Sequence, residues 1–295
     1  MSGYAVRLKE SLFHPNIRLK NDFPLAGKQL GKVYTKALVY FTLGSAMPIL
    51  LVLGAMMLLP YLPYSISDPA ISIMNRCFPG DKPSATFLVA MALISFITGA
   101  LLELAVLVGA LKNQGKTFCQ AVSLNLDALK GSSRWQTAFN FAWRVFVAVT
   151  LWAVLDIALG MLLPSGHQAS LDYTKMMAGG NLWIWFAIAA IGAPLTEEIV
   201  FRGFLFSALR RSFGQGRIAH WLGDGRYADV AAVVASSLVF TLMHFQFDWA
   251  AVQIFLAGCF LAELYRRSGT LWTGIVCHAC NNGFTVLFLA MSSHH

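Results

Sequence analysis

Long apolar runs separated by short polar segments dominate the pattern of hydrophobic and polar positions along the chain. There are seven of them, covering residues 37–62, 86–111, 137–163, 182–209, 229–247, 249–265 and 270–291. A helix that crosses a bilayer needs about 20 mostly apolar residues, so each run is close to the length of one crossing. The pattern therefore predicts an all-α membrane protein with about seven transmembrane helices.

The polar segments predict how the chain is organised. Residues 1–36 form a basic tail that lacks the apolar core and cleavage site of a signal peptide, and residues 37–291 form a single transmembrane domain. Residues 292–295 are a short tail or the remnant of an expression tag. Lys and Arg gather in the first tail and in alternate connections, mainly 112–134 and 202–226, which places the N-terminus in the cytoplasm.

Composition and charge agree with a membrane protein. Hydrophobic residues make up 57% of the chain and charged residues 12%, whereas soluble proteins carry roughly a quarter charged residues. The net charge of +8 follows from the basic tail and loops, so we attribute it to topology and anionic lipid, and expect no nucleic-acid partner. The five irregularly spaced cysteines are predicted to be packing residues. Residues 112–135 are predicted to hold an interfacial helix, and residues 212–228 a Gly-rich loop.

Ionisable side chains inside the apolar runs need an explanation, because each costs about 2.5–3.5 kcal/mol at the centre of a membrane helix. In chain order they are Glu103, Arg144, Asp156, Glu197, Glu198, Arg202, His244, Glu263 and His278. The first three are predicted to form a structural network between N-terminal helices.

The stretch Thr-Glu-Glu-Ile-Val-Phe-Arg-Gly at 196–203 places two acids beside one base. Glu198 and Arg202 are four residues apart with the acid first, the favourable order for a helical ion pair. Glu197 lies about 100° further round the helix and can point away from Arg202. Taken alone, Glu197 is better explained as a buried acid that is hydrogen-bonded to a neighbouring helix or kept neutral by burial than as a catalytic group.

Three further polar residues are predicted to lie at the same depth as Glu197. His278 and Asn282 share one helix face, and His244 ends an apolar segment. With 1.5 Å of rise per residue, these positions lie roughly 12–20 Å from the predicted cytoplasmic helix ends, near the middle of the bilayer. Glu197, His244, His278 and Asn282 are therefore predicted to line one hydrated cavity.

Such a cavity suits hydrolysis of a peptide bond. A carboxylate with two imidazoles can take a proton from water and polarise an amide carbonyl, while an Asn amide donates to the developing oxyanion. Glu197, His244 and His278 could instead bind zinc. The two histidines are not paired as in an HExxH helix, so we favour a metal-free mechanism without a cofactor, with zinc as the alternative.

Three motifs occur in a fixed order on successive helices. They are Glu-Glu-x-x-x-Arg at 197–202, Phe-x-x-x-His at 240–244 and His-x-x-x-Asn at 278–282. Together they resemble the CAAX-protease and bacteriocin-processing (CPBP, or Abi) family of intramembrane endopeptidases, which includes the Ras-converting CAAX endopeptidase. The resemblance covers about residues 180–290, which we expect to be the catalytic core.

The resemblance implies a role for each matching residue. Glu197 would activate the water, with His244 helping to hold it, and His278 and Asn282 would bind the oxyanion. The residues implied to support the site are Glu198, Arg202 and Phe240.

Other functions stay open on the sequence alone. Intramembrane acids and histidines also build proton relays, so a proton-coupled transporter is one alternative, although the chain lacks visibly related halves. A catalytically silent immunity or scaffold protein is another. For the protease we expect a membrane-associated peptide or protein substrate and a bacterial cytoplasmic membrane, or the endoplasmic reticulum in a eukaryote.

Overall fold

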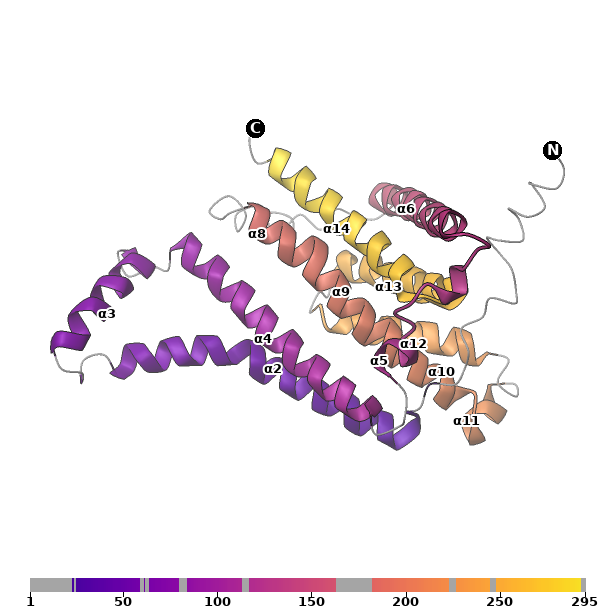
Figure 1. Cartoon of the computed structure of the whole chain (residues 1–295), viewed down its shortest axis with the longest axis horizontal. Coiled ribbons are helices and arrows are strands. Elements are labelled where there is room, and N and C mark those ends of the chain that lie inside the picture. Colours follow the sequence, from indigo (N-terminus) through magenta and orange to yellow (C-terminus); the bar gives the residue numbers. More distant parts are fainter. Residues whose placement is uncertain are drawn as a thin grey trace.

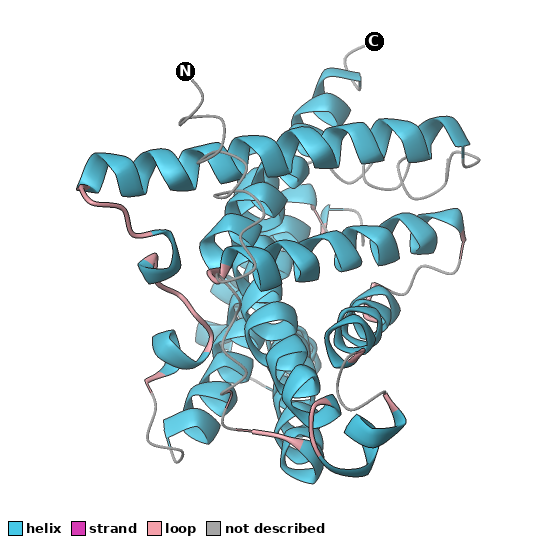
Figure 2. Cartoon of the chain, turned by 90° about the vertical axis from the view of Figure 1, so that its right-hand side faces the viewer, coloured by secondary structure: helices cyan, strands magenta, loops and turns pink. Residues whose placement is uncertain are grey.

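Helices form almost all of the part of the chain that the structure describes, and this part contains no strand (Figures 1 and 2). The computed structural model describes residues 23, 25–58, 61, 64–79, 84–112, 117–162, 182–222, 227–244 and 248–292. The predicted all-α class is thereby confirmed.

Each of the seven predicted apolar runs coincides with a long helical stretch. Six of these are α2 (Gly27–Leu58), α4 (Ala85–Lys112), α6 (Arg134–Leu162), α12 (Ala228–Leu242), α13 (Trp249–Ser268) and α14 (Leu271–Ser292). The remaining one is continuous and consists of α8 (Leu182–Phe186), η4 (Ala187–Gly192), α9 (Ala193–Glu197), η5 (Glu198–Phe206) and α10 (Ser207–Phe213). We call this stretch the central helix.

Membrane crossing is supported most strongly for four helices. By length and composition the candidates among the described residues are Gly27–Leu58, Ala90–Lys112, Arg134–Leu162 and Leu182–Phe213. Helix α12 has 15 residues and is about 22 Å long, less than a hydrocarbon core of about 30 Å. The chain is an integral membrane protein, while seven crossings and a cytoplasmic N-terminus stay predictions.

The predicted interfacial helix at 112–135 is wrong. Between α4 and α6, the described residues 117–133 hold only the four-residue α5 (Phe118–Ala121) and the 3₁₀ turn η3 (Asp127–Leu129), and Val122 between them is fully buried. A Cβ atom added at Gly203 would lie 2.9 Å from Val122 Cβ, so the missing side chain on the central helix lets this segment pack into the core. An apolar stripe on a short segment cannot reveal such an inward fold.

The predicted loop at 212–228 is also partly helical. The central helix continues to Phe213, and α11 (Gly216–Trp221) follows almost at once. Residues 223–226 of this loop lie outside the described part of the chain. A further helix that the sequence pattern did not predict, α3 (Tyr64–Cys77), lies between α2 and α4 (Figure 1).

Helices α2 and α4 pack closely where two glycines meet. The hydroxyl of Thr98 donates a hydrogen bond to the carbonyl of Gly44 at 2.7 Å. A Cβ atom at Gly99 would overlap the Ser45 hydroxyl and lie 2.9 Å from the backbone carbonyl oxygen of Phe41, so the crossing needs a residue without a side chain. Small residues at such crossings are typical of membrane helix pairs.

The start of α2 is fastened to the central helix. Phe23 is almost completely buried, and its ring packs edge-to-face on Phe204 with centroids 5.3 Å apart. The backbone N–H of Gly27 donates to the Ser212 hydroxyl at 2.8 Å. These contacts join the α2–α4 pair to the helix that carries the two adjacent acids.

Helix ends meet in an ionic network that includes Glu263. Arg210 of α10 contacts Asp229 of α12 at 2.6 Å, and Arg266 of α13 contacts the same Asp229 at 3.3 Å. Arg266 also pairs with Glu263 at 2.6 Å. Glu263 thus lies close to the end of its helix with basic partners, which explains its presence in an apolar run.

The predicted network of Glu103, Arg144 and Asp156 is not assembled as one group. Arg144 and Asp156 are on the same helix, α6, about 18 Å apart along its axis. Glu103 is buried on the neighbouring helix α4.

Helix α6 crosses the helices that carry the site. It is seen nearly end-on in Figure 1 and runs across the view in Figure 2. Its buried residues Ala148 and Trp152 pack with Leu261 of α13 and Cys277 of α14. The predicted packing role of Cys277 is confirmed by this cluster, and none of the five cysteines is in a disulfide.

Candidate active site

The central helix widens where it carries the two acids. Its segments η4 and η5 have the π-helical pattern, and Glu197 and Glu198 lie at the junction of α9 and η5. Pro194 is buried at the start of α9 and has no backbone N–H to donate. Irregular turns of this kind often mark functional sites in helices.

The missing N–H of Pro194 explains the partner of Asn282. In the π-helical pattern the N–H of Ala193 donates to the carbonyl of Ile188, five residues earlier. By the same pattern, the carbonyl of Ala189 would accept a hydrogen bond from the N–H of residue 194. Because proline cannot donate, the Ala189 carbonyl accepts a hydrogen bond from Asn282 Nδ2 of α14 instead, at 2.9 Å. One amide proton and the carbonyl oxygen of Asn282 are not used by this bond.

The predicted ion pair between Glu198 and Arg202 is present and completely buried. Their Oε1 and Nη1 atoms are 3.2 Å apart, with side chains 0% and 2% exposed. The alignment is poor for a hydrogen bond at Nη1, so this contact is mainly electrostatic. Arg202 Nη2 also donates to the carbonyl of Gly258 at 3.5 Å, and the guanidinium lies 4.2 Å from the centre of the Phe240 ring. These contacts on three sides compensate for the desolvation of the charge.

His278 lies between the two acids. Its Nδ1 is 3.0 Å from Glu198 Oε1, and since a carboxylate paired with Arg202 accepts hydrogen bonds, Nδ1 is the donor. Its Nε2 is 3.8 Å from Glu197 Oε2, too far for a direct hydrogen bond. Glu197 Oε2 is buried and has no hydrogen-bond partner among the described residues. The imidazole is therefore oriented by one acid and faces the other.

Helix α14 approaches Glu198 closely because residue 274 is glycine. A Cβ atom added at Gly274 would lie 3.1 Å from Glu198 Oε2. This contact is tighter than ordinary van der Waals packing, so a larger residue would displace the carboxylate that holds His278.

His244 joins the site through Phe240. The carbonyl of Phe240 can only accept, so His244 Nδ1–H donates to it at 2.8 Å and Nε2 is left for other partners. The ring of Phe240 lies 4.5 Å from the His244 ring and 6.4 Å from the His278 ring, measured between centroids. Phe240, which is 3% exposed, is thus the common neighbour of both histidines and of Arg202.

The proposed zinc ligands are not clustered. Among the described residues no group of three or more His, Cys, Asp or Glu side chains is arranged to hold a metal ion. Glu197 and His278 lie near each other, while His244 Nδ1 is bonded to its own helix.

Two residues of the site were not predicted from the sequence. Trp152 of α6 stacks on the His278 ring with centroids 6.1 Å apart and planes 20° apart. Trp152 sits in a uniformly apolar run, so nothing in its surroundings distinguished it from a lipid-facing residue. Pro194 is different, because a proline inside an apolar run is a readable sign of helix irregularity.

The site combines paired carboxylates, an imidazole and a guanidinium in an integral membrane protein, and comparison with known proteins finds similarity to membrane proteases. Residues 179–284 match the model of the Rce1-like family, described as type II CAAX prenyl endopeptidase Rce1-like. The matched region contains all three motifs.

One curated relative is the membrane-embedded CAAX protease MroQ of Staphylococcus aureus (strain USA300). It is 30% identical over 149 residues, which is 46% of this chain and 57% of the relative. The chain thus matches little more than half the length of that protein. No solved structure matches the chain.

Proposed function

We propose that the chain is an intramembrane endopeptidase that hydrolyses a peptide bond in a membrane-associated peptide or protein. The attacking water is activated by Glu197. The observation that carries this proposal is the placement of Glu197 Oε2, buried, without a hydrogen-bond partner among the described residues, and 3.8 Å from His278 Nε2. A buried acceptor of this kind is costly unless it has a role, and the distance suits a shared water.

Charge balance favours Glu197 over Glu198 as the base. Glu198 is paired with Arg202, so their charges cancel, whereas Glu197 adds one uncompensated negative charge when His278 is neutral. Taking a proton from water brings this group of residues to neutrality, which is favourable in a site of low dielectric. Glu198 in contrast orients His278 and holds Arg202.

The other polar groups can stabilise the transition state. The proton that Glu197 takes from the water can pass to Nε2 of His278, and the imidazolium then donates from Nε2 to the oxyanion that forms at the scissile carbonyl while Nδ1 stays bonded to Glu198. Asn282 has one amide proton left for the same oxygen, and His244 Nε2 can help hold the water. The same proton then passes to the leaving amine as the carbon–nitrogen bond breaks.

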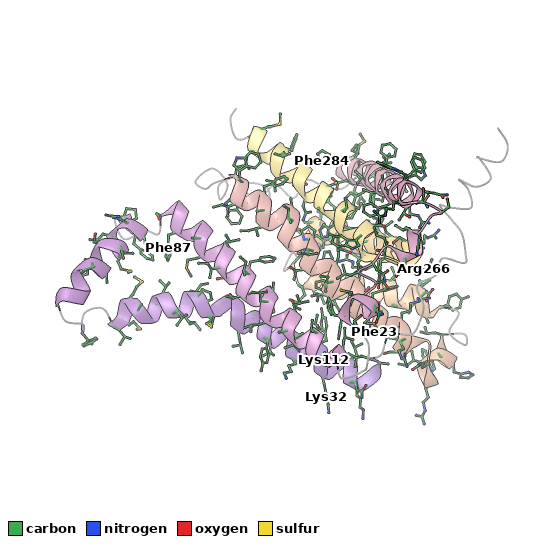
Figure 3. All side chains as sticks on the ribbon, in the orientation of Figure 1. Phe23, Lys32, Phe87, Lys112, Arg266 and Phe284 are labelled. Atoms are coloured by element: carbon green, nitrogen blue, oxygen red, sulfur yellow. The ribbon has the colours of Figure 1, made fainter. Side chains whose placement is uncertain are left out.

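The wider setting follows the sequence predictions. We propose the N-terminus in the cytoplasm, seven crossings and a bacterial cytoplasmic membrane. Lys32 of α2 and Lys112 of α4 lie at the same end of the helix pair in Figure 3, which supports a common cytoplasmic end. The relative from Staphylococcus aureus supports a bacterial setting.

The test compares protein termini in membranes of cells that carry wild type, Glu197→Gln or Glu198→Gln at matched expression. Glu197→Gln keeps size and removes the base, so we expect the new termini made by wild type to disappear. Adding 1,10-phenanthroline to wild-type membranes should leave cleavage intact, and a loss there would favour the zinc alternative. If wild type produces no new termini, or Glu197→Gln still produces them, the proposal is wrong.

A further inference from the structure

The ring plane of His278 needs a restraint beyond its hydrogen bond. The terminal side-chain torsion of histidine is broad and has no sharp staggered minimum. The bond from Nδ1 to Glu198 fixes one atom of the ring, yet the imidazole can still turn about it. Since Nε2 is the atom that faces Glu197, the angle of the ring decides whether the two groups share one water.

Packing on the ring faces supplies this restraint. Phe240 meets the imidazole nearly at right angles, with planes 77° apart. Trp152 is nearly parallel to it, in the offset stacked geometry that aromatic pairs prefer. Both Trp152 and His278 are only 6% exposed, so the stack is shielded from surrounding lipid and water.

Trp152 is itself held in place. Its ring packs edge-to-face on Phe260 of α13, with centroids 5.4 Å apart and planes 82° apart. It also belongs to the buried cluster formed with Ala148, Leu261 and Cys277. The indole therefore has a rigid position set by three helices.

We propose that Trp152 is a positioning residue that sets the ring plane of His278 and so keeps Nε2 directed at Glu197. The inference rests on the proposed function of His278. It gives α6 a role in the site, although this helix lies outside the matched region 179–284. The indole face also attracts the imidazole whenever it becomes charged during turnover.

Three variants of the full-length protein test the proposal. Trp152→Met keeps an apolar side chain but removes the stacking ring, and Trp152→Phe keeps an aromatic face. The control is Trp143→Met, the same change nine residues earlier on α6, where Trp143 stacks on Phe146 of its own helix at 5.8 Å.

The first measurement does not need a substrate. In detergent micelles, diethyl pyrocarbonate is added and carbethoxylation of His278 is followed by mass spectrometry, with His244 as internal reference. A freed imidazole ring reacts faster, so we expect the ratio of His278 to His244 modification to rise at least fivefold in Trp152→Met. It should stay within twofold of wild type in Trp152→Phe and Trp143→Met.

The second measurement uses the substrate revealed by the comparison of termini. We expect Trp152→Met to lower kcat at least tenfold with KM within twofold, and Trp152→Phe to restore kcat to within threefold of wild type. Unchanged modification in a folded Trp152→Met, or equal losses in both Trp152 variants, would overturn the proposal. A change in modification without proteolysis by wild type would support the positioning and refute the proposed function.

Discussion

Removing either partner of the buried ion pair should destabilise the protein, because the charge that stays behind loses its counter-ion. In Arg202→Met, the Glu198 carboxylate is 0% exposed and keeps only His278 as a partner. Breaking a buried pair in this way costs about 3–5 kcal/mol, because an uncompensated charge stays in a low-dielectric site. Glu198→Gln should fall at the lower end of that range, because Arg202 retains the Gly258 carbonyl and the Phe240 ring.

The double variant separates the ion pair from simple packing. Glu198→Gln with Arg202→Met removes both charges and keeps most of the volume, so its cost should be smaller than the sum of the single costs. We expect a coupling energy of about 2–3 kcal/mol, near the upper end for residues in direct contact. A positive coupling of this size cannot arise from two independent packing defects.

Reversible unfolding by sodium dodecyl sulfate in mixed micelles gives the free energies, with the fluorescence of the eight tryptophans as the signal. The control is Arg211→Met, the same substitution at a less buried position on α10, which should change stability by no more than about 0.5 kcal/mol. Additive costs in the double variant, or equal costs for Arg202→Met and Arg211→Met, would refute the reasoning.

Two further predictions concern the framework of the site. Gly99→Ala should destabilise the protein by about 1–3 kcal/mol, because the new Cβ would overlap α2, whereas Gly109→Ala on the same helix meets no atom within 4 Å and should gain about 0.5–1 kcal/mol. The same unfolding assay measures both, and equal effects would contradict the close crossing. Asp229→Asn removes the shared partner of Arg210 and Arg266 and should cost about 1 kcal/mol at low salt, falling by half or more at 1 M salt. A cost independent of salt would show that these pairs contribute little.

The sequence by itself determined the features that depend on local spacing. Apolar runs of helical length predicted the helices, since the hydrophobic requirement of a bilayer is read directly from composition. The pairing of Glu198 with Arg202 followed from a four-residue interval on one helix face, and it is present. The three motifs were sufficient to indicate the family whose model matches residues 179–284.

Predictions from local spacing were wrong or incomplete where the chain departs from regular helices. The amphipathic pattern of 112–135 predicted a surface helix, yet Val122 packs against the central helix because Gly203 leaves room for it. Asn282 likewise donates to the carbonyl of Ala189, ninety-three residues away in the chain, because Pro194 has no N–H to donate to that carbonyl. Such effects arise only when irregular backbone meets a neighbouring helix.

Only the tertiary structure decided how the chemical groups face one another. Sequence placed Glu197 and His278 at a similar depth, but their side chains meet only because α14 packs against the central helix at Gly274. The stack of Trp152 on His278 was equally unreadable, because apolar residues facing lipid and apolar residues facing a site look alike in a membrane sequence. Helical period and hydrophobicity therefore define which helices exist, while direction and distance between side chains follow from how those helices pack.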